Sequence, residues 1–160
     1  MVSRPTPYAP IVHICFVCTG NICRSPMAAL VFGEQLRRAG LADRVRVTSA
    51  GTGAWHVGEP AHPRTVRVLA RNGYPTAHRA AQVDDSHLDA DLLIALDAGH
   101  AKALRGLGAQ EVRLLREFDP EAGDDLDVPD PYYGTQEDYE QVYAMVEAAC
   151  AGLLDWVRTR

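Results

Sequence analysis

The chain has 160 residues, the size of one domain with a substantial core. Its net charge of −5 makes nucleic acid or an anionic membrane an unfavourable bulk partner. No apolar run approaches the ~20 residues of a membrane span, and we expect no signal peptide. Four cysteines without a disulfide-scaffold spacing suit a reducing compartment, so a cytoplasmic protein is expected; export by a route that leaves no sequence mark stays open.

The first element predicted is a buried strand over residues 11–17, which follows a proline-containing stretch (1–10) expected to be a flexible tail. Residues 11–17 are almost all apolar, as in a strand covered on both faces. A helix is expected over 25–39, with Pro26 in its first turn and Gly40 just after its end. Between strand and helix lies the loop Cys18-Thr-Gly-Asn-Ile-Cys-Arg24-Ser25.

This loop has the composition of a site for a phosphate monoester. Backbone N–H groups at a helix N-terminus favour an anion, and Gly20 permits a tight turn and a close approach. Arg24 can hold two phosphoryl oxygens at once, and the same positive field favours the thiolate of Cys18, which is the nucleophilic form. Ser25 can donate its hydroxyl to that thiolate. Asn21 is expected to brace the loop, because its short amide side chain tolerates left-handed geometry.

Cys15 and Cys18 also form a C-x-x-C pair, which would suit a thioredoxin-type site or half of a zinc site. Residues three apart on a strand face opposite sides, which makes such a pairing awkward. No second C-x-x-C completes a zinc site. Cys15 is therefore expected in the core.

The remainder of the chain alternates strands with helices. We expect strands over 44–48, 90–96 and 111–115, and helices over 61–72 and 98–107. The strands over 11–17 and 90–96 are continuously apolar, whereas the other two are mixed and suit sheet edges. This predicts a single-domain α/β fold with an open four-stranded parallel sheet of order 2-1-3-4 and helices on both faces. The topological switch point then lies between the first and third strands, beside Cys18, where ligands of open α/β sheets bind.

The C-terminal part begins with an acidic stretch over 117–133, which lacks the spacing of an EF-hand and is expected to be mostly solvated. Thr135 and Asp138 have the spacing of a capping box, and Asp97 is expected to cap the helix over 98–107 in a similar way. A long amphipathic helix is predicted to end the chain, because apolar side chains recur at helical spacing: Tyr139, Val142, Tyr143, Val146, Cys150, Leu153 and Val157.

The segment Val17-Cys-Thr-Gly-Asn-Ile-Cys-Arg-Ser-Pro-Met27 resembles the signature loop of the low-molecular-weight protein tyrosine phosphatases. Further matches recur in family order from about His13 to Trp156: Ser49-Ala-Gly, Trp55 with its flanking Gly and Pro, His78-Arg-Ala, and Asp130-Pro-Tyr-Tyr133. The amino-acid sequence around Ser49 and Trp55 is most similar to that of the actinobacterial, mycobacterial-type branch. The resemblance implies one phosphatase domain over 11–160.

The resemblance also implies residue roles. Cys18 would form a phosphocysteine, Arg24 would bind phosphate, and Asp130 would act as general acid and then base. The rest of the phosphate-binding loop would be Thr19, Gly20, Asn21, Ile22 and Cys23; Trp55, Tyr132 and Tyr133 would form aromatic walls; and Ser49 and His78 would support the loop. No metal or other cofactor is expected. Cys23 would form a protective, reversible disulfide with Cys18 under peroxide.

The expected partners are a phosphotyrosine-containing protein as substrate and phosphate or vanadate as active-site ligands, and a monomer is expected. Two alternatives stay open. A thioredoxin-coupled arsenate reductase of the same fold would need additional cysteines to relay a disulfide, and only Cys15 and Cys150 lie outside the loop. A non-catalytic phosphotyrosine- or anion-binding module would be expected to lack Cys18, Arg24 or Asp130, and all three are present.

Overall fold

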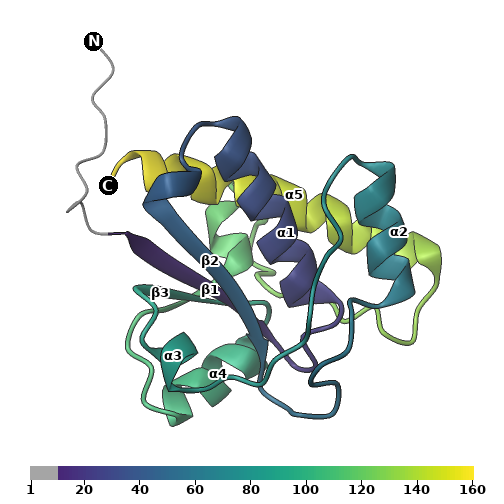
Figure 1. Ribbon diagram of the computed structural model, residues 1–160, viewed down its shortest axis with the longest axis horizontal. Helices are drawn as coiled ribbons and strands as arrows, with labels where there is room; N and C mark the ends of the chain where they lie inside the picture. The colour runs from purple at the N-terminus through teal and green to yellow at the C-terminus, as the bar shows by residue number, and fades with distance from the viewer. Residues whose placement is uncertain (1–10) are drawn as a thin grey trace.

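The computed structural model describes residues 11–160, and the tail predicted over 1–10 lies outside the described residues. The strands are β1 (Val12–Cys18), β2 (Val45–Gly51), β3 (Leu92–Ala95) and β4 (Val112–Leu114). The helices are α1 (Arg24–Arg38), α2 (Pro63–Arg71), α3 (Asp85–Leu88), α4 (Ala98–Gly106) and α5 (Gln136–Arg158), with short 3₁₀ helices η1 (Ala42–Arg44) and η2 (Leu115–Phe118) (Figure 1).

The sheet confirms the predicted topology. Its order is β2-β1-β3-β4, and all three pairings are parallel. β1 pairs with β2 along its whole length and with β3 on its other side, from Ile14 to Val17. The chain therefore leaves β1 toward one side of the sheet and later returns on the other, which places the switch point at the carboxyl end of β1.

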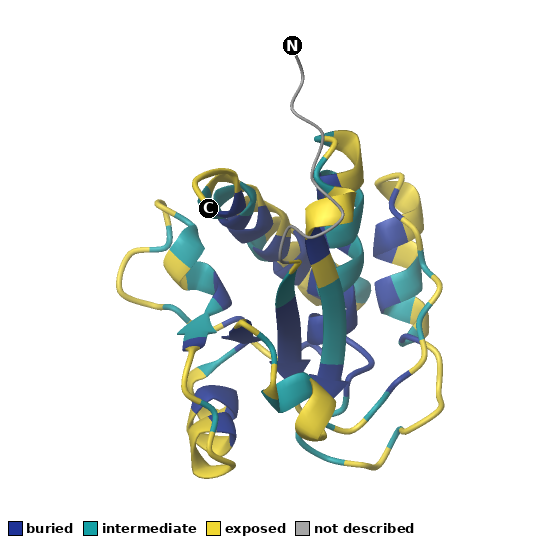
Figure 2. Ribbon diagram, turned by 60° about the vertical axis from the view of Figure 1, so that its left-hand side comes forward, coloured by how far each residue is buried: buried dark blue, intermediate teal, exposed yellow. Residues whose placement is uncertain are grey.

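Helices cover both faces of the sheet, as predicted: α1, α2 and α5 lie on one side and α3 and α4 on the other (Figure 1). The central strand alternates between the two cores, since Ile14 and Phe16 pack in the cluster beneath α1 and α5 while Cys15 and Val17 pack in the cluster beneath α4. This double coverage explains why the β1 sequence is continuously apolar. The burial is visible in Figure 2, where the middle of the sheet is dark blue. Cys15 is a core residue, as expected.

Helix ends follow the predicted signals. Gly40, Gly73 and Gly108 adopt positive φ just after α1, α2 and α4. The side chain of Asp97 caps α4, and Thr135 forms a capping box with Asp138 at the start of α5. The residues predicted for the inner face of α5 are all buried.

Some element ends differ from those predicted, and three short elements were not predicted. β2 extends to Gly51, three residues beyond the predicted end, because pairing with all of β1 continues the ladder. β4 is shorter than predicted, since it pairs with β3 over three residues only. The single turn of α3 and the 3₁₀ helices η1 and η2 were not predicted. They are too short to show a hydrophobic period.

Candidate active site

The loop between β1 and α1 turns at Asn21, which has φ +57° and is the sole non-glycine residue with positive φ in residues 11–160. The left-handed residue is thus Asn21, whose short amide side chain was expected to tolerate this geometry. At Gly20 space is limited, because a Cβ there would lie 2.9 Å from the His56 ring and would displace that ring. Asn tolerates the left-handed region because its short side chain forms local hydrogen bonds.

Asn21 is fully buried and bonded on every side. Its Nδ2 donates to Ser25 Oγ at 2.8 Å and to Ser49 Oγ at 3.0 Å, and its Oδ1 accepts from the backbone N–H of Ala81 at 3.0 Å. His78 Nε2 lies 2.7 Å from the Asn21 carbonyl oxygen. Burial lowers the pKa of His78, so the ring is neutral near pH 7, and Nε2 is the protonated nitrogen because a carbonyl can only accept. Ser49 and His78, the residues expected to support the loop, therefore both contact Asn21.

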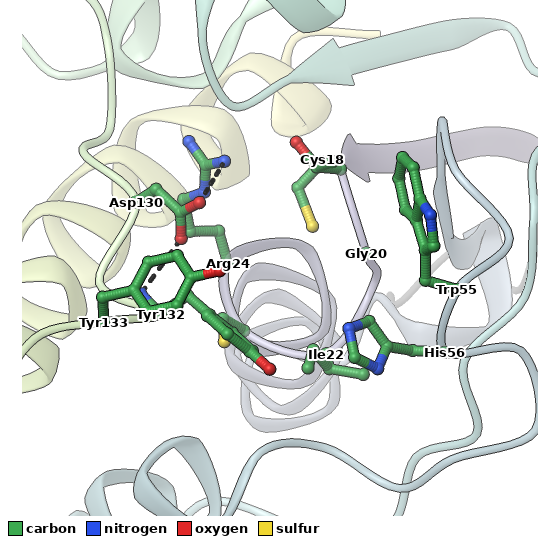
Figure 3. Close-up of a pocket in the computed structure, with 11 residues that line it drawn as sticks. Cys18, Gly20, Ile22, Arg24, Trp55, His56, Asp130, Tyr132 and Tyr133 are labelled. Carbon is green, nitrogen blue, oxygen red and sulfur yellow. Dashed lines mark hydrogen bonds and ion pairs between the residues drawn. The ribbon is translucent and has the colours of Figure 1, made fainter.

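Cys18 ends β1 with its Sγ directed into the cavity enclosed by the loop (Figure 3). Ser25 Oγ lies 2.8 Å from that sulfur. Because Ser25 Oγ already accepts a hydrogen bond from Asn21, its own hydrogen is available to Sγ. A hydroxyl donor in this position stabilises a thiolate.

Arg24 begins α1 and is 3% exposed. Its Nη1 donates to Asp97 Oδ2 and to the Val128 carbonyl, both at 2.9 Å, and its Nη2 lies 3.7 Å from Asp130 Oδ2. Asp97 was predicted only as a helix cap, and its ion pair with Arg24 was not predicted. The feature that could have indicated this ion pair is the position of Asp97 just after the buried strand β3, which lies next to the end of β1. Burial opposes ionisation of Asp97, but bonds from the His100 N–H and from Arg24 hold its pKa below the ordinary value.

Asp130 enters the cavity from the segment between η2 and α5. That segment is tied to the junction of β3 and α4, because the Val128 N–H donates to the Leu96 carbonyl at 2.8 Å and Asp127 Oδ1 accepts from the Ala98 N–H at 2.9 Å. Asp130 Oδ1 in turn accepts from the Tyr132 N–H at 3.1 Å. The carboxylate therefore lies beside Arg24, across the cavity from Trp55 (Figure 3).

The cavity has a volume of about 380 Å³. It is lined by Cys18, Thr19, Gly20, Ile22, Cys23, Arg24, Trp55, His56, Asp130, Tyr132 and Tyr133. The structure thus brings the predicted loop, acid and aromatic residues to one cavity, with Asn21, Ser25, Ser49 and His78 behind the loop. At the rim, Trp55 is 76% and Tyr133 97% exposed, whereas Tyr132 packs against Tyr133 and His62.

Two histidines near the phosphate loop were missed. His56 lines the cavity, and its Nδ1 pairs with Glu59. The sequence feature that could have indicated His56 as a cavity residue is its position directly after Trp55. His100, on α4, lies 2.8 Å through Nε2 from the hydroxyl oxygen of Thr19.

The fold and the site together define the class: an α/β protein whose parallel sheet carries a cysteine–arginine loop at its switch point, directly before a helix. The chain belongs to the low molecular weight phosphotyrosine protein phosphatase family, whose sequence profile matches residues 13–160. It is 60% identical over 152 residues to low molecular weight protein-tyrosine phosphatase A of Mycobacterium tuberculosis, covering 93% of each chain. Its identity to a low molecular weight protein-tyrosine-phosphatase of Streptomyces coelicolor is 56% over 153 residues, covering 91% of this chain and 93% of that one.

Among solved structures, YfkJ from Bacillus subtilis matches with a TM-score of 0.86 and 35% identity, covering 95% of this chain and 98% of the other. These comparisons confirm the family and the actinobacterial branch that the sequence resembled. By class the protein is a protein-tyrosine phosphatase, a phosphoric monoester hydrolase. Within residues 11–160, every helix is too short or too polar to cross a membrane.

Proposed function

We propose that the protein hydrolyses phosphotyrosine in protein substrates through a phosphocysteine on Cys18. The observation that carries the proposal is the convergence of Cys18 Sγ, the Arg24 guanidinium and the Asp130 carboxyl on one aromatic-walled cavity. The backbone N–H groups of the loop and the N-terminus of α1 supply further positive potential at the same place.

In the first step, the Cys18 thiolate attacks phosphorus and the bond from phosphorus to the tyrosine oxygen breaks. Arg24 and the loop amides hold the equatorial oxygens, so catalysis rests on positioning and electrostatic stabilisation. Asp130, in its protonated form, transfers its proton to the departing phenolate oxygen. The product of this step is a phosphocysteine and a neutral tyrosine.

In the second step, Asp130 accepts a proton from a water molecule, which attacks phosphorus as the sulfur leaves. The Ser25 hydroxyl, 2.8 Å from Sγ, stabilises the returning thiolate. Trp55, Tyr132 and Tyr133 would enclose the aromatic ring of the substrate, which favours phosphotyrosine over the shorter phosphoserine and phosphothreonine side chains.

The fully buried state of Cys15 and Cys150 supports this proposal over arsenate reduction with thioredoxin, because neither thiol is accessible for relaying a disulfide from Cys18. Burial also raises the pKa of Cys15 to about 11 and raises the pKa of Cys150, which disfavours the reactive thiolate at both positions.

The test is hydrolysis of an aryl phosphate and of matched phosphotyrosine and phosphoserine peptides, with EDTA present. Cys18→Ser should abolish turnover while phosphate binding, measured by calorimetry, persists. Asp130→Asn should lower kcat by about 10²- to 10⁴-fold, the range for loss of a general acid. Asp124→Asn removes an exposed carboxylate from the same acidic stretch and serves as the matched control, with unchanged activity expected.

Ordinary turnover by the Cys18→Ser variant would exclude the phosphocysteine mechanism. Phosphate binding by the wild type without any turnover would instead identify an anion-binding module, and arsenate reduction that requires thioredoxin would identify the reductase.

A further inference from the structure

The first turn of α4 contacts both ends of the phosphate loop. Asp97, the N-cap, accepts a hydrogen bond from Arg24, the last residue of the Cys-x5-Arg segment. Three residues later, His100 contacts Thr19, the residue directly after the nucleophile. Asp97 also accepts from the backbone N–H of His100 at 3.0 Å, so its side chain caps the turn that carries His100.

His100 is a buried group for which the proposed chemistry has no use. It is 5% exposed, and its Nε2 lies 2.8 Å from Thr19 Oγ1. Its Nδ1 lies 3.2 Å from Asp97 Oδ1 but lacks the alignment of a hydrogen bond. Burial, helped by the positive charge of Arg24, lowers the pKa of His100 to about 4, so the ring is neutral at neutral pH. The bond to Thr19 forms with either ring tautomer, because a hydroxyl can donate or accept.

Thr19 is held from the opposite side as well. Its carbonyl oxygen accepts from the Gly53 N–H at 3.0 Å, and the Cys18 carbonyl accepts from the Thr52 N–H at 2.9 Å. Those two donors belong to the segment that carries Trp55. The first residue of the loop is thus fixed between the Trp55 segment and α4 by one backbone bond and one side-chain bond.

We propose that His100 is a positioning residue of the phosphate loop: with Asp97 it clamps the two ends of the loop at Thr19 and Arg24. The inference rests on the proposed function. Donors to phosphate must be held where charge lies in the transition state, and a displacement of about 1 Å can cost 10²-fold in rate. Without the bond to His100, the Thr19 end of the loop is held by its backbone alone and the amide donors lose their alignment.

The experiment is a double-mutant cycle with His100→Leu and Thr19→Val, measured as kcat/KM for an aryl phosphate and as inhibition by vanadate. Each single variant should lose about fivefold to tenfold in kcat/KM, which is the usual value of one hydrogen bond. The double variant should lose no more than the single variants, because both remove the same bond. Inhibition by vanadate should weaken in parallel with kcat/KM, because vanadate imitates the transition state. Binding of inorganic phosphate should weaken less.

His100→Gln and Thr19→Ser keep a polar group at each position and should recover activity to within about threefold of wild type. Lys102→Leu alters an exposed position on the same helix and is the matched control. If His100→Leu does not fold, the difference in kcat/KM between Thr19→Val and Thr19→Ser tests the proposal instead. Both variants are expected to fold, because Thr19 is exposed.

Additive losses of kcat/KM in the double variant, or full activity in either single variant, would refute the proposal that His100 positions the loop through Thr19. A wild-type protein without phosphatase activity would refute the proposed function instead. In that case the same cycle, measured as phosphate affinity by calorimetry, still tests the clamp, with the same non-additivity expected.

Discussion

At the scale of single residues, Asn21 joins the backbone of the phosphate loop to its surroundings. It combines a left-handed φ with side-chain bonds to Ser25, Ser49 and the Ala81 N–H. The bond to Ser25 directs the Ser25 hydroxyl hydrogen toward Cys18 Sγ. One side chain therefore acts on both the shape of the loop and the environment of the sulfur.

Replacing Asn21 separates the two contributions. Asn21→Ala loses the side-chain bonds and is strained at positive φ, whereas Asn21→Gly loses the same bonds without strain. Both variants should lower kcat by about 10²-fold if the bonds align the loop, with the glycine variant the more stable in urea unfolding. A glycine variant with nearly full activity would show that backbone conformation alone is sufficient.

At the scale of elements, α5 approaches η2 so closely that one of its positions has no room for a side chain. A Cβ on Gly152 would lie 1.8 Å from the Phe118 carbonyl oxygen. The contact anchors η2, which overlaps the start of the acidic stretch that leads to Asp130. Gly33 on α1 provides a contrast, since a Cβ there would meet nothing within 4 Å.

Alanine at these two helical glycines should have opposite effects on stability. Gly33→Ala should raise the free energy of unfolding by up to about 1 kcal/mol, because alanine is the better helix former. Gly152→Ala should lower it by about 1–3 kcal/mol, the range for overpacking a filled site. Urea unfolding of both variants measures the difference, and a stabilised Gly152→Ala would contradict the close contact between α5 and η2.

At the scale of the whole molecule, burial fixes the protonation of several groups. It lowers the pKa of His13, His62, His78 and His100, in the last case to about 4. It raises the pKa of the Cys15 and Cys23 thiols to about 11. The folded chain therefore holds these histidines neutral and these thiols protonated over a wider pH range than the unfolded chain does.

Stability should consequently fall toward both acid and alkaline pH. Below about pH 6.5 the unfolded state takes up protons that neutral His100 does not, and the loss continues as the pH approaches 4. Above about pH 9 the unfolded state releases thiol protons that the folded state retains. Urea unfolding between pH 4 and 10 tests this. His100→Gln should reduce the slope between pH 5 and 6 by up to about 1.4 kcal/mol per unit, and an unchanged slope would contradict a neutral, buried His100.

Sequence alone was sufficient for the sheet order, the main helices and the position of the loop between β1 and α1. Each of these depends on information that is local along the chain. Continuous apolar runs specify β1 and β3, and mixed strands specify the edges. Asp97 and Thr135 cap helices through bonds that span three residues. The residues around Cys18 also carry the family resemblance, from which the places of Trp55, His78 and Asp130 followed.

Only the tertiary structure decided how the loop is held from outside. Asp97 pairs with Arg24 across 73 positions, and His100 reaches Thr19 across 81. Those contacts exist because β3 lies beside β1 and α4 begins at the same edge of the sheet. No periodicity or local motif specifies which side chain of α4 meets which residue of the loop. The amino-acid sequence by itself therefore determined the sheet, its main helices and the cysteine–arginine loop at the switch point, and the packing of distant elements determined which buried groups contact that loop.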